Sequence, residues 1–336
     1  MIGFILYPDW IRPEIIPGFP YLRWYGLMYL VAFSITYLLF KYQVKERGLN
    51  VIADDIFSLF FWGIIGLLIG ARLFAVTLFD RTGYFLRNPL QAILPISWAG
   101  GQCTFTGFQG MSYHGGLLGS IVAIVIYCRV KKIDILDWGD MILAGVPLGY
   151  FFGRMGNFIN GELYGRITTM PWGMIFPDAE TFSTKEPWVR AFAGEVGIDI
   201  LGMDRVNLPR HPSQLYEGFF EGIFLWLILW FVIRKRKPFK GFVIAAYVIG
   251  YGVIRFIIEY ARQPDRNNSI LIRLVDVSGG YAYSSPWNFT LGQILCFLMI
   301  VGGILSLLVF RSRAAKQGQA LPDARPNLKK LRKKIK

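Results

Sequence analysis

Seven long apolar segments are the feature of this sequence that most restricts its fold. A membrane-spanning helix needs about 20 consecutive apolar residues, because it rises ~1.5 Å per residue through a hydrocarbon core ~30 Å thick. The segments lie at 21–40, 56–79, 113–128, 141–159, 215–233, 242–260 and 291–310. We therefore predict an all-α polytopic membrane protein with about seven transmembrane helices.

The composition agrees with a membrane protein and narrows the chemistry. Hydrophobic residues make up 54% of the chain and charged residues only 17%, against about 45–50% and about 25% in soluble domains. The three cysteines are scattered, so neither a disulfide framework nor a cysteine metal site is predicted. The two histidines exclude an all-histidine metal site. Nucleotide-binding and metalloprotease motifs do not occur, and we expect no cofactor and no metal.

Basic residues indicate which side of the membrane each connection occupies. They gather in alternate connections, at 41–47, 129–132 and 234–240, and again in the tail from Arg311. The positive-inside rule makes these segments cytoplasmic, so the N-terminus is expected outside and the C-terminus in the cytoplasm. The net charge of +14 is then explained by topology and by contact with lipid headgroups. We expect membrane lipids as partners, and no nucleic acid.

The outer connections and the helix contacts give the domain organisation. Residues 166–211 carry mixed charges and several prolines, and we expect a small external arm there, between the fourth and fifth helices. The chain has no internal repeat, and we expect one transmembrane domain over 1–310, which includes the arm, and a basic cytoplasmic tail over 311–336. Glycines four residues apart, at 66–70 and 115–119, indicate close helix packing.

Charged and strongly polar residues inside the apolar segments are the candidate functional residues. Each charge near the centre of a span costs at least about 2.5–3.5 kcal/mol, so it needs a reason. With the predicted orientation, all of these residues fall in the outer half of the membrane, which indicates one polar cavity open to the outside. They are Arg23, Arg72, His114, Arg154, Asn157, Asn160, Glu162, His211, Glu217, Arg255 and Glu259.

Spacing places some of these side chains on common helix faces. Tyr251, Arg255 and Glu259 are four apart, and Arg154 and Asn157 are three apart, so each set shares a face. A planar guanidinium suits a phosphate, and two arginines from different helices suit an anionic lipid headgroup. An internal ion pair between Arg255 and Glu259 explains their spacing equally well.

The strongest local signal is the run at 153–166, GRMGNFINGELYGR. With four further blocks in the same order it resembles the prolipoprotein diacylglyceryl transferase family of bacterial enzymes, over roughly residues 10 to 310. The segments 99–109 and 267–288 are longer than is usual in that family, and Arg23 stands where some members have histidine. The further blocks are 23–29, RWYGLMY; 110–116, GMSYHGG; 210–217, RHPSQLYE; and 251–265, YGVIRFIIEYARQPD.

The resemblance implies a specific reaction and location. The diacylglyceryl group of phosphatidylglycerol would pass to the thiol of the lipobox cysteine in a prolipoprotein signal peptide. A thioether would form and glycerol phosphate would leave. The enzyme would sit in the bacterial cytoplasmic (inner) membrane as a multi-pass protein.

The residues support a hypothesis for this mechanism. We expect Arg154 and Arg255 to hold the phosphate, and Glu162 and Glu259 to fix the arginines, with Glu259 also able to take a proton. His114 is the leading candidate base for the substrate thiol, since at a helix start its cationic form is disfavoured. Alternatively, the arginine fields alone lower the thiol pKa and His114 only positions the substrate. The residues expected to orient the headgroup by hydrogen bonds are Tyr25, Asn157 and Asn160.

Two other functional classes fit part of the pattern. An anionic-lipid or solute transporter would also carry buried charges and glycine-rich helices, but its polar residues should continue into the cytoplasmic half, and here they do not. A noncatalytic assembly protein would use the same ion pairs only to hold its helices together. The ordered sequence blocks favour the enzyme over both.

Overall fold

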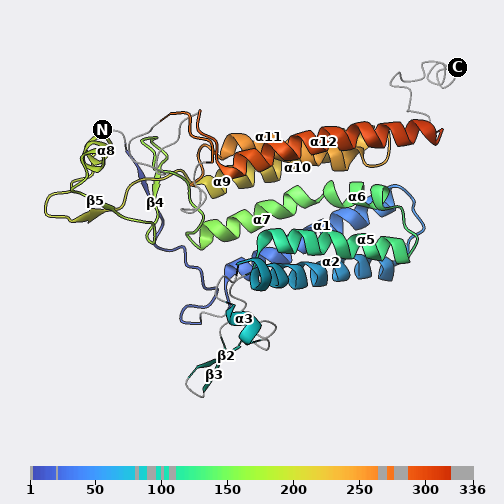
Figure 1. Cartoon of the computed structure of the whole chain (residues 1–336), viewed down its shortest axis with the longest axis horizontal. Coiled ribbons are helices and arrows are strands. Elements are labelled where there is room, and N and C mark those ends of the chain that lie inside the picture. The colour runs from blue at the N-terminus through green and yellow to red at the C-terminus, as the bar shows by residue number, and fades with distance from the viewer. Residues whose placement is uncertain are drawn as a thin grey trace. The chain divides into compact units, whose positions relative to one another are not determined.

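The computed structural model consists mainly of long helices, as Figure 1 shows. It describes residues 3–19, 22–79, 83–88, 96–99, 102–105, 111–263, 271–275 and 287–318. The chain divides into two compact units, one made of residues 1–40 and 139–336 and the other of residues 41–138. Each unit is described by itself below. The predicted helical class is confirmed.

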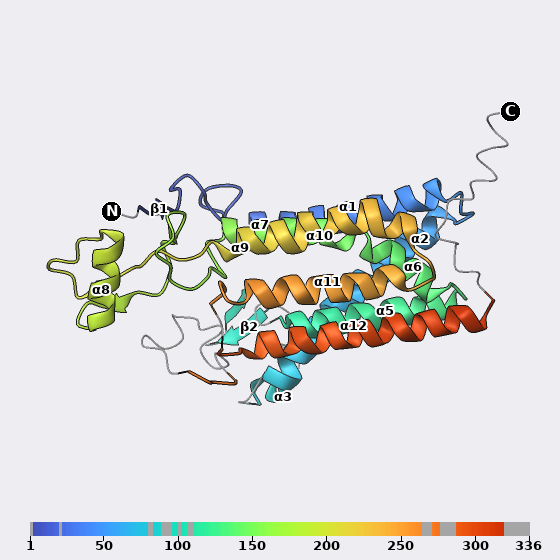
Figure 2. The ribbon, with the colours of Figure 1, turned by 90° about the horizontal axis from the view of Figure 1, so that it is seen from above.

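The first unit contains most of the long helices. Helix α1 (Trp24–Glu46) begins in it, and α6 (Ile135–Leu143) ends in it. Figure 2 shows α11 beside α12, and the helix that starts with α9 packs against α7. The remaining elements are α7 (Val146–Ile159), α9 (Ser213–Glu217), η2 (Gly218–Phe224), α10 (Leu225–Leu227), η3 (Ile228–Ile233), η4 (Arg234–Arg236), α11 (Phe242–Ile258) and α12 (Leu291–Lys316).

Local chemistry explains where several of these helices begin. Pro147 lies in the first turn of α7, where its missing N–H costs nothing. Thr290 and Gln293 form a capping box at the start of α12. Helix α11 follows Gly241, whose φ of 86° suits glycine. The carboxylate of Asp140 on α6 accepts hydrogen bonds from the backbone N–H groups of Gly241 and Ile244, at 2.9 and 3.0 Å, so a side chain from another helix caps α11.

The described residues hold five helices that are long and apolar enough to cross a membrane. Helices α6 and α7 together would give a sixth span, with a bend of 44° between them. Helix α11, at 17 residues, is apolar but shorter than these. Each of the seven predicted segments is mostly helical where the structure describes it, with non-helical residues at 22–23, 144–145 and 259–260. The chain is therefore a multi-pass membrane protein with five or six candidate spans, and seven spans stay a prediction.

Some helix ends differ from the predicted segments. Helix α1 continues to Glu46, six residues beyond residue 40, and α12 continues to Lys316, beyond the predicted boundary at residue 310. Both extensions carry basic residues, which are favourable in the last turn of a helix and keep their charged ends in water. The described residues do not include 319–336 of the tail or most of 99–109 and 267–288. The predicted division into a transmembrane domain and a basic tail stays a prediction.

The second unit is built on a close pair of helices, α2 (Ala53–Phe74) and α5 (Tyr113–Val130). At Gly66, Gly70, Gly115 and Gly119 an added Cβ would collide with backbone of the facing helix. The close helix packing predicted from the glycine spacing is confirmed at these positions, and the structure shows that the two glycine pairs face each other. The unit also contains η1 (Ala75–Phe79), α3 (Tyr84–Arg87) and an antiparallel pair of strands, β2 (Ile96–Ala99) and β3 (Gln102–Phe105).

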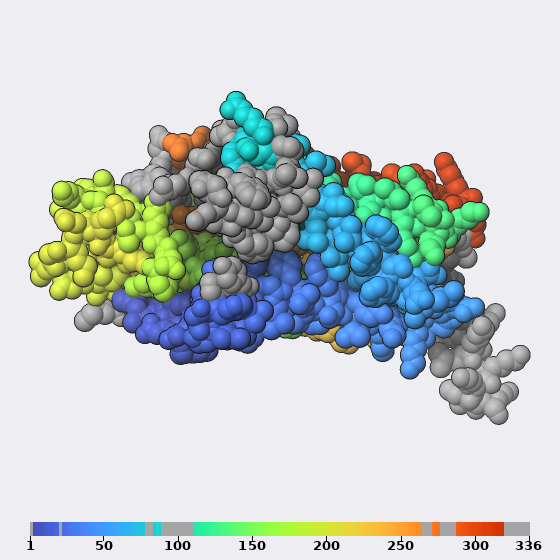
Figure 3. Space-filling view, turned by 90° about the horizontal axis from the view of Figure 1, so that it is seen from below, coloured from blue at the N-terminus to red at the C-terminus, as the bar shows by residue number. Residues whose placement is uncertain are grey.

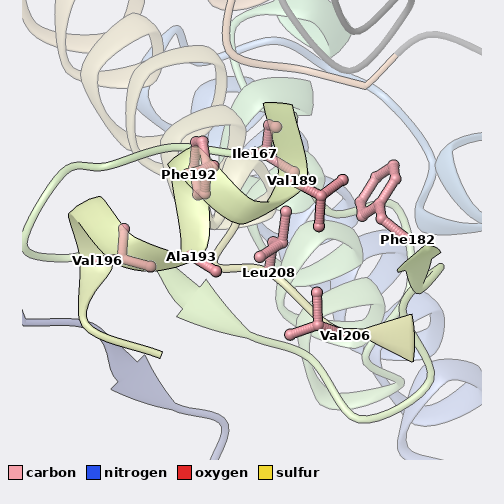
Figure 4. Close-up of a cluster of buried hydrophobic side chains, with 8 residues drawn as sticks. All are labelled: Ile167, Phe182, Val189, Phe192, Ala193, Val196, Val206 and Leu208. Carbon is pink, nitrogen blue, oxygen red and sulfur yellow. The ribbon is translucent and has the colours of Figure 1, made fainter. Parts of the chain in front are cut away.

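The segment predicted as an arm has its own small core in the first unit. Eight buried residues pack together there, and Figure 4 shows them around α8 (Pro187–Val196). Strand β1 (Ile5–Leu6) pairs with β4 (Met174–Ile175), and Figure 3 shows the dark blue N-terminal segment against the yellow-green arm. The other strands, β5 (Phe182–Ser183) and β6 (Arg205–Val206), pair with each other. The core residues are Ile167, Phe182, Val189, Phe192, Ala193, Val196, Val206 and Leu208.

The arm core gives a first prediction. Leu208 is fully buried, and Leu208→Ala should destabilise the arm by about 2–5 kcal/mol through lost burial and a residual cavity. Limited proteolysis should then cut within 166–211 faster than in the wild type. The matched control is Leu201→Ala, also in the arm but 87% exposed, which should leave the cleavage rate unchanged. Equal rates in all three proteins would contradict an independently packed arm.

Candidate active site

A buried carboxylate lies at the centre of the site. Glu217, the last residue of α9, is fully buried, and one oxygen, Oε2, accepts from two arginines. Arg154 on α7 approaches it to 2.8 Å and Arg255 on α11 to 2.7 Å. The other oxygen lies 4.0 Å from Nε of Arg262. The two arginines predicted to act together are thus brought together by Glu217, a charged residue of the apolar segments for which the sequence predicted no role.

Arg154 is the more accessible of the two arginines. Its side chain is 14% exposed, against 9% for Arg255. Its Nε donates to the hydroxyl of Tyr150 at 2.7 Å, and its NH1 makes a longer bond of 3.4 Å to Oδ1 of Asn157. The Tyr150 hydroxyl donates in turn to Glu221 at 2.6 Å. One guanidinium nitrogen of Arg154 is therefore only weakly engaged, on the side of Asn157.

Arg255 is surrounded by carboxylates. Besides Glu217 it contacts Glu221 at 3.5 Å and Glu259 at 3.2 Å. Glu259 also accepts a hydrogen bond of 3.0 Å from Thr290, the N-cap of α12. The predicted i,i+4 pair of Arg255 and Glu259 is present, but it is one contact of a larger network. Glu221 and Tyr150 were not identified from the sequence, although a glutamate inside the segment 215–233 was a signal of the same kind.

The polar residues at the end of α7 form a second, connected group. Glu162 accepts from Nδ2 of Asn157 at 2.9 Å and from Nδ2 of Asn160 at 3.3 Å. The carboxylate of Glu162 thus bonds the two asparagines, whereas we expected it to fix an arginine. Oδ1 of Asn160 is buried and accepts no hydrogen bond from the described residues, which leaves an acceptor for a hydroxyl or N–H donor.

Tyr25 lies on α1 against the same part of α7. A Cβ added at Gly156 would lie 3.2 Å from the Tyr25 ring, so the glycine allows the two helices to approach. The Tyr25 hydroxyl shares a hydrogen bond of 3.0 Å with Tyr29. Tyr25 therefore lies beside Gly156, the residue before Asn157, and its role in binding the headgroup stays a prediction.

His114 belongs to the second unit. It lies in the first turn of α5, which Ser112 caps through a bond of 3.3 Å from the Gly115 N–H. Its side chain is exposed, and its ring contacts the Tyr113 ring at a centroid distance of 5.7 Å. The predicted place at a helix start is confirmed, and its role as a base stays a prediction.

The base of the arm carries buried titratable groups outside the spans. Burial lowers the pKa of His211 below its ordinary value, and Nδ1 of His211 lies 3.2 Å from the Tyr216 hydroxyl. That hydroxyl accepts from Nε1 of Trp172 at 2.7 Å. Burial also lowers the pKa of Arg166, to about 10. No group of three or more potential metal ligands was found in the part of the chain that the structure describes.

Comparisons with known proteins identify the relatives of this chain. The family described as prolipoprotein diacylglyceryl transferase matches residues 15–309. The phosphatidylglycerol–prolipoprotein diacylglyceryl transferase of Treponema denticola is 49% identical over 92% of this chain and 95% of its own length. The enzyme of the same name from Treponema pallidum is 49% identical over 92% and 97%. That of Chlorobaculum tepidum is 42% identical over 87% of each chain.

The central carboxylate gives a stability prediction. Glu217→Ala would leave Arg154 and Arg255 without their shared partner, and breaking a buried ion pair on one side costs about 3–5 kcal/mol. We expect a clear fall in the melting temperature of the detergent-solubilised protein. Glu195→Ala, at an exposed site on α8, is the control and should melt like the wild type. If the two variants had the same melting temperature, the carboxylate of Glu217 would not hold these helices together.

The buried histidine gives a pH prediction. Because the folded-state pKa of His211 is lowered, the unfolded chain binds more protons as the pH falls below about 6.5, and stability is lost over that range. His211→Gln should therefore lose less stability than the wild type between neutral pH and pH ~5.5. Tyr216→Phe keeps the histidine buried and should retain the wild-type dependence. Parallel thermal melts at the two pH values measure the difference.

Proposed function

The chain belongs to the prolipoprotein diacylglyceryl transferase family, and on that premise we propose that it transfers the diacylglyceryl group of phosphatidylglycerol to the thiol of a prolipoprotein lipobox cysteine. The observation that carries this is the family match over residues 15–309, together with 49% identity to relatives named for the reaction. The same match leaves the transporter alternative without support. The chain would act in the bacterial cytoplasmic membrane.

The proposed topology has seven spans, with the N-terminus outside and the C-terminus cytoplasmic. The alternating basic connections support it. The arm and the charged cluster around Glu217 would then lie at the outer side, beside the headgroups. The lipid and the tethered signal peptide could both reach the cluster from the membrane.

We assign different parts to the two arginines. Arg154 would touch the phosphate, because it is the more exposed and its NH1 has only the 3.4 Å contact to Asn157. Arg255 would act through Glu217, whose Oε2 it shares with Arg154. Such fixed charges need no rearrangement when the leaving phosphate gains negative charge. Tyr25, Asn157 and Asn160 would orient the glycerol hydroxyls, with Glu162 holding the asparagines.

The transfer itself is a displacement at carbon. The sulfur of the substrate cysteine forms a bond to the glycerol carbon, the bond from that carbon to the phosphate oxygen breaks, and glycerol phosphate leaves. The thiol proton must pass to a base, since thiols with a pKa near ~8.5 are mostly protonated at neutral pH. Glu259 is already held by Arg255 and Thr290, which favours the exposed His114 as the acceptor.

The reaction can be tested directly. The purified protein is mixed with phosphatidylglycerol and a lipobox peptide, and mass spectrometry should detect the diacylglyceryl thioether. A peptide with serine in place of the cysteine should remain unmodified. The absence of adduct on the cysteine peptide would overturn the proposed function.

The division between the arginines predicts unequal effects of lysine. Arg154→Lys keeps the charge but loses the planar fork, so both kcat and phosphatidylglycerol binding should fall, with kcat/KM lower by on the order of 100-fold. Arg255→Lys should lower kcat and melting temperature while changing lipid binding little. Steady-state kinetics with lipid-binding titrations separate these effects. Equal loss of lipid binding in both variants would favour two direct phosphate contacts.

The proton acceptor is tested by pH. If His114 is the base, His114→Gln should lower kcat by about 10²–10⁴-fold and remove a pH-dependent limb of the rate profile. An unchanged rate and profile would favour the alternative, in which the arginines alone promote the thiolate.

A further inference from the structure

Leu163 has an unusual backbone conformation next to the charged cluster. Its φ is +57°, in the left-handed region, where the Cβ of an ordinary residue crowds the backbone and glycine or asparagine is more common. Among the described non-glycine residues only Lys132 shares a positive φ. Such conformations persist where the surroundings fix them, and they gather at functional sites.

Two fully buried side chains fix this turn. Ser213 donates to the carbonyl of Leu163 at 3.0 Å, and Gln214 donates to the carbonyl of Glu162 at 2.6 Å. Gly165 adds a backbone bond of 2.8 Å to His211, so close that a Cβ there would lie 2.7 Å from the His211 Cβ. The start of α9 therefore holds the turn that follows α7.

The result of this conformation is an exposed aliphatic side chain at the edge of the site. Leu163 is 43% exposed. Its neighbour Glu162 connects through Asn157 to Arg154 by contacts of 2.9 and 3.4 Å. The left-handed turn thus sends the carboxylate of Glu162 toward the charged cluster and leaves the leucine outside the core.

A second exposed apolar side chain lies over the same helix. Trp172, 49% exposed, is tied by its N–H to Tyr216, and Tyr216 lies three residues after Ser213 on α9, on the same face. Leu163 and Trp172 are therefore held by neighbouring residues of one helix turn. We call these two residues the Leu163 surface.

We propose that the Leu163 surface binds the apolar residues next to the cysteine of the prolipoprotein and so makes Leu163 a specificity-determining residue. This rests on the proposed function. A peptide is favoured over the lipid because both residues lie outside the helices, at the base of the arm, whereas acyl chains lie along the spans. A peptide bound there would place its cysteine beside Glu162 and Asn157, which connect to Arg154.

The test compares substitutions at one position. Leu163→Ala removes the contact and keeps the strained turn, Leu163→Gly removes both, and Leu163→Met keeps an apolar contact. Initial rates are measured with a lipobox peptide and with phosphatidylglycerol, each varied in turn. The control is Leu201→Ala in the arm, 87% exposed, and melting temperatures report folding.

The Ala and Gly variants should both raise KM for the peptide by on the order of tenfold, with kcat and the lipid KM near wild type. Leu163→Met and Leu201→Ala should match the wild type. A purely structural role predicts a normal peptide KM in the Gly variant, whose turn is relaxed, and that result overturns the proposal. A rise in the lipid KM instead overturns it in favour of a lipid contact. Absence of transfer by the wild type would mark failure of the proposed function.

Discussion

The carboxylate of Glu217 is the contact on which the arrangement of the first unit depends. It ends α9, and its Oε2 joins α7 through Arg154 and α11 through Arg255. Inside a protein such charges interact strongly, but each has lost its water and must be fully compensated. Three arginines and three glutamates therefore collect in one place, and the helices that carry them are fixed relative to one another.

Close helix contacts make this meeting of charges possible. Gly218 and Gly222 follow Glu217, and Cβ atoms there would lie 3.1 Å from Met155 and 2.8 Å from Phe151 of α7. The π-helical stretch η2 begins at the same point, and π-helical turns are frequent at functional sites. The glycines bring the backbones near enough for Arg154 to reach Glu217 and for Tyr150 to reach Glu221. The close packing of these helices thus allows the ion pairs to form, and the ion pairs in turn hold the helices together.

The arrangement suits a reaction that releases an anion. NH1 of Arg154 has a long contact of 3.4 Å to Asn157, and Oδ1 of Asn160 accepts no hydrogen bond from the described residues. The other charged groups of the cluster are held by ion pairs, Glu217 by two arginines and Glu259 by Arg255. Groups that are already oriented lose little freedom when charge develops on a leaving phosphate. The turn at Leu163 is fixed by the same helix, because Ser213 and Gln214 of α9, which ends in Glu217, donate hydrogen bonds to the carbonyls of Leu163 and Glu162.

The sequence by itself determined the helical class, the positions of the apolar segments, the close packing at the paired glycines, and the family. Those features are local or lie in ordered blocks, and periodicity and motif order make them visible. It also identified Arg154, Arg255 and the pair of Arg255 with Glu259, which spacing along one helix reveals.

Only the tertiary structure decided which partner each charge has. The bonds of Glu217 with two other helices, of Tyr150 with Glu221, and of Glu162 with Asn157 and Asn160 depend on how helices pack and where a turn points. Residues 34 to 71 positions apart, such as Glu221 with Arg255 and with Tyr150, leave no spacing pattern in the sequence. The same holds for the left-handed turn at Leu163, which bonds from a distant helix impose on a residue that does not favour it.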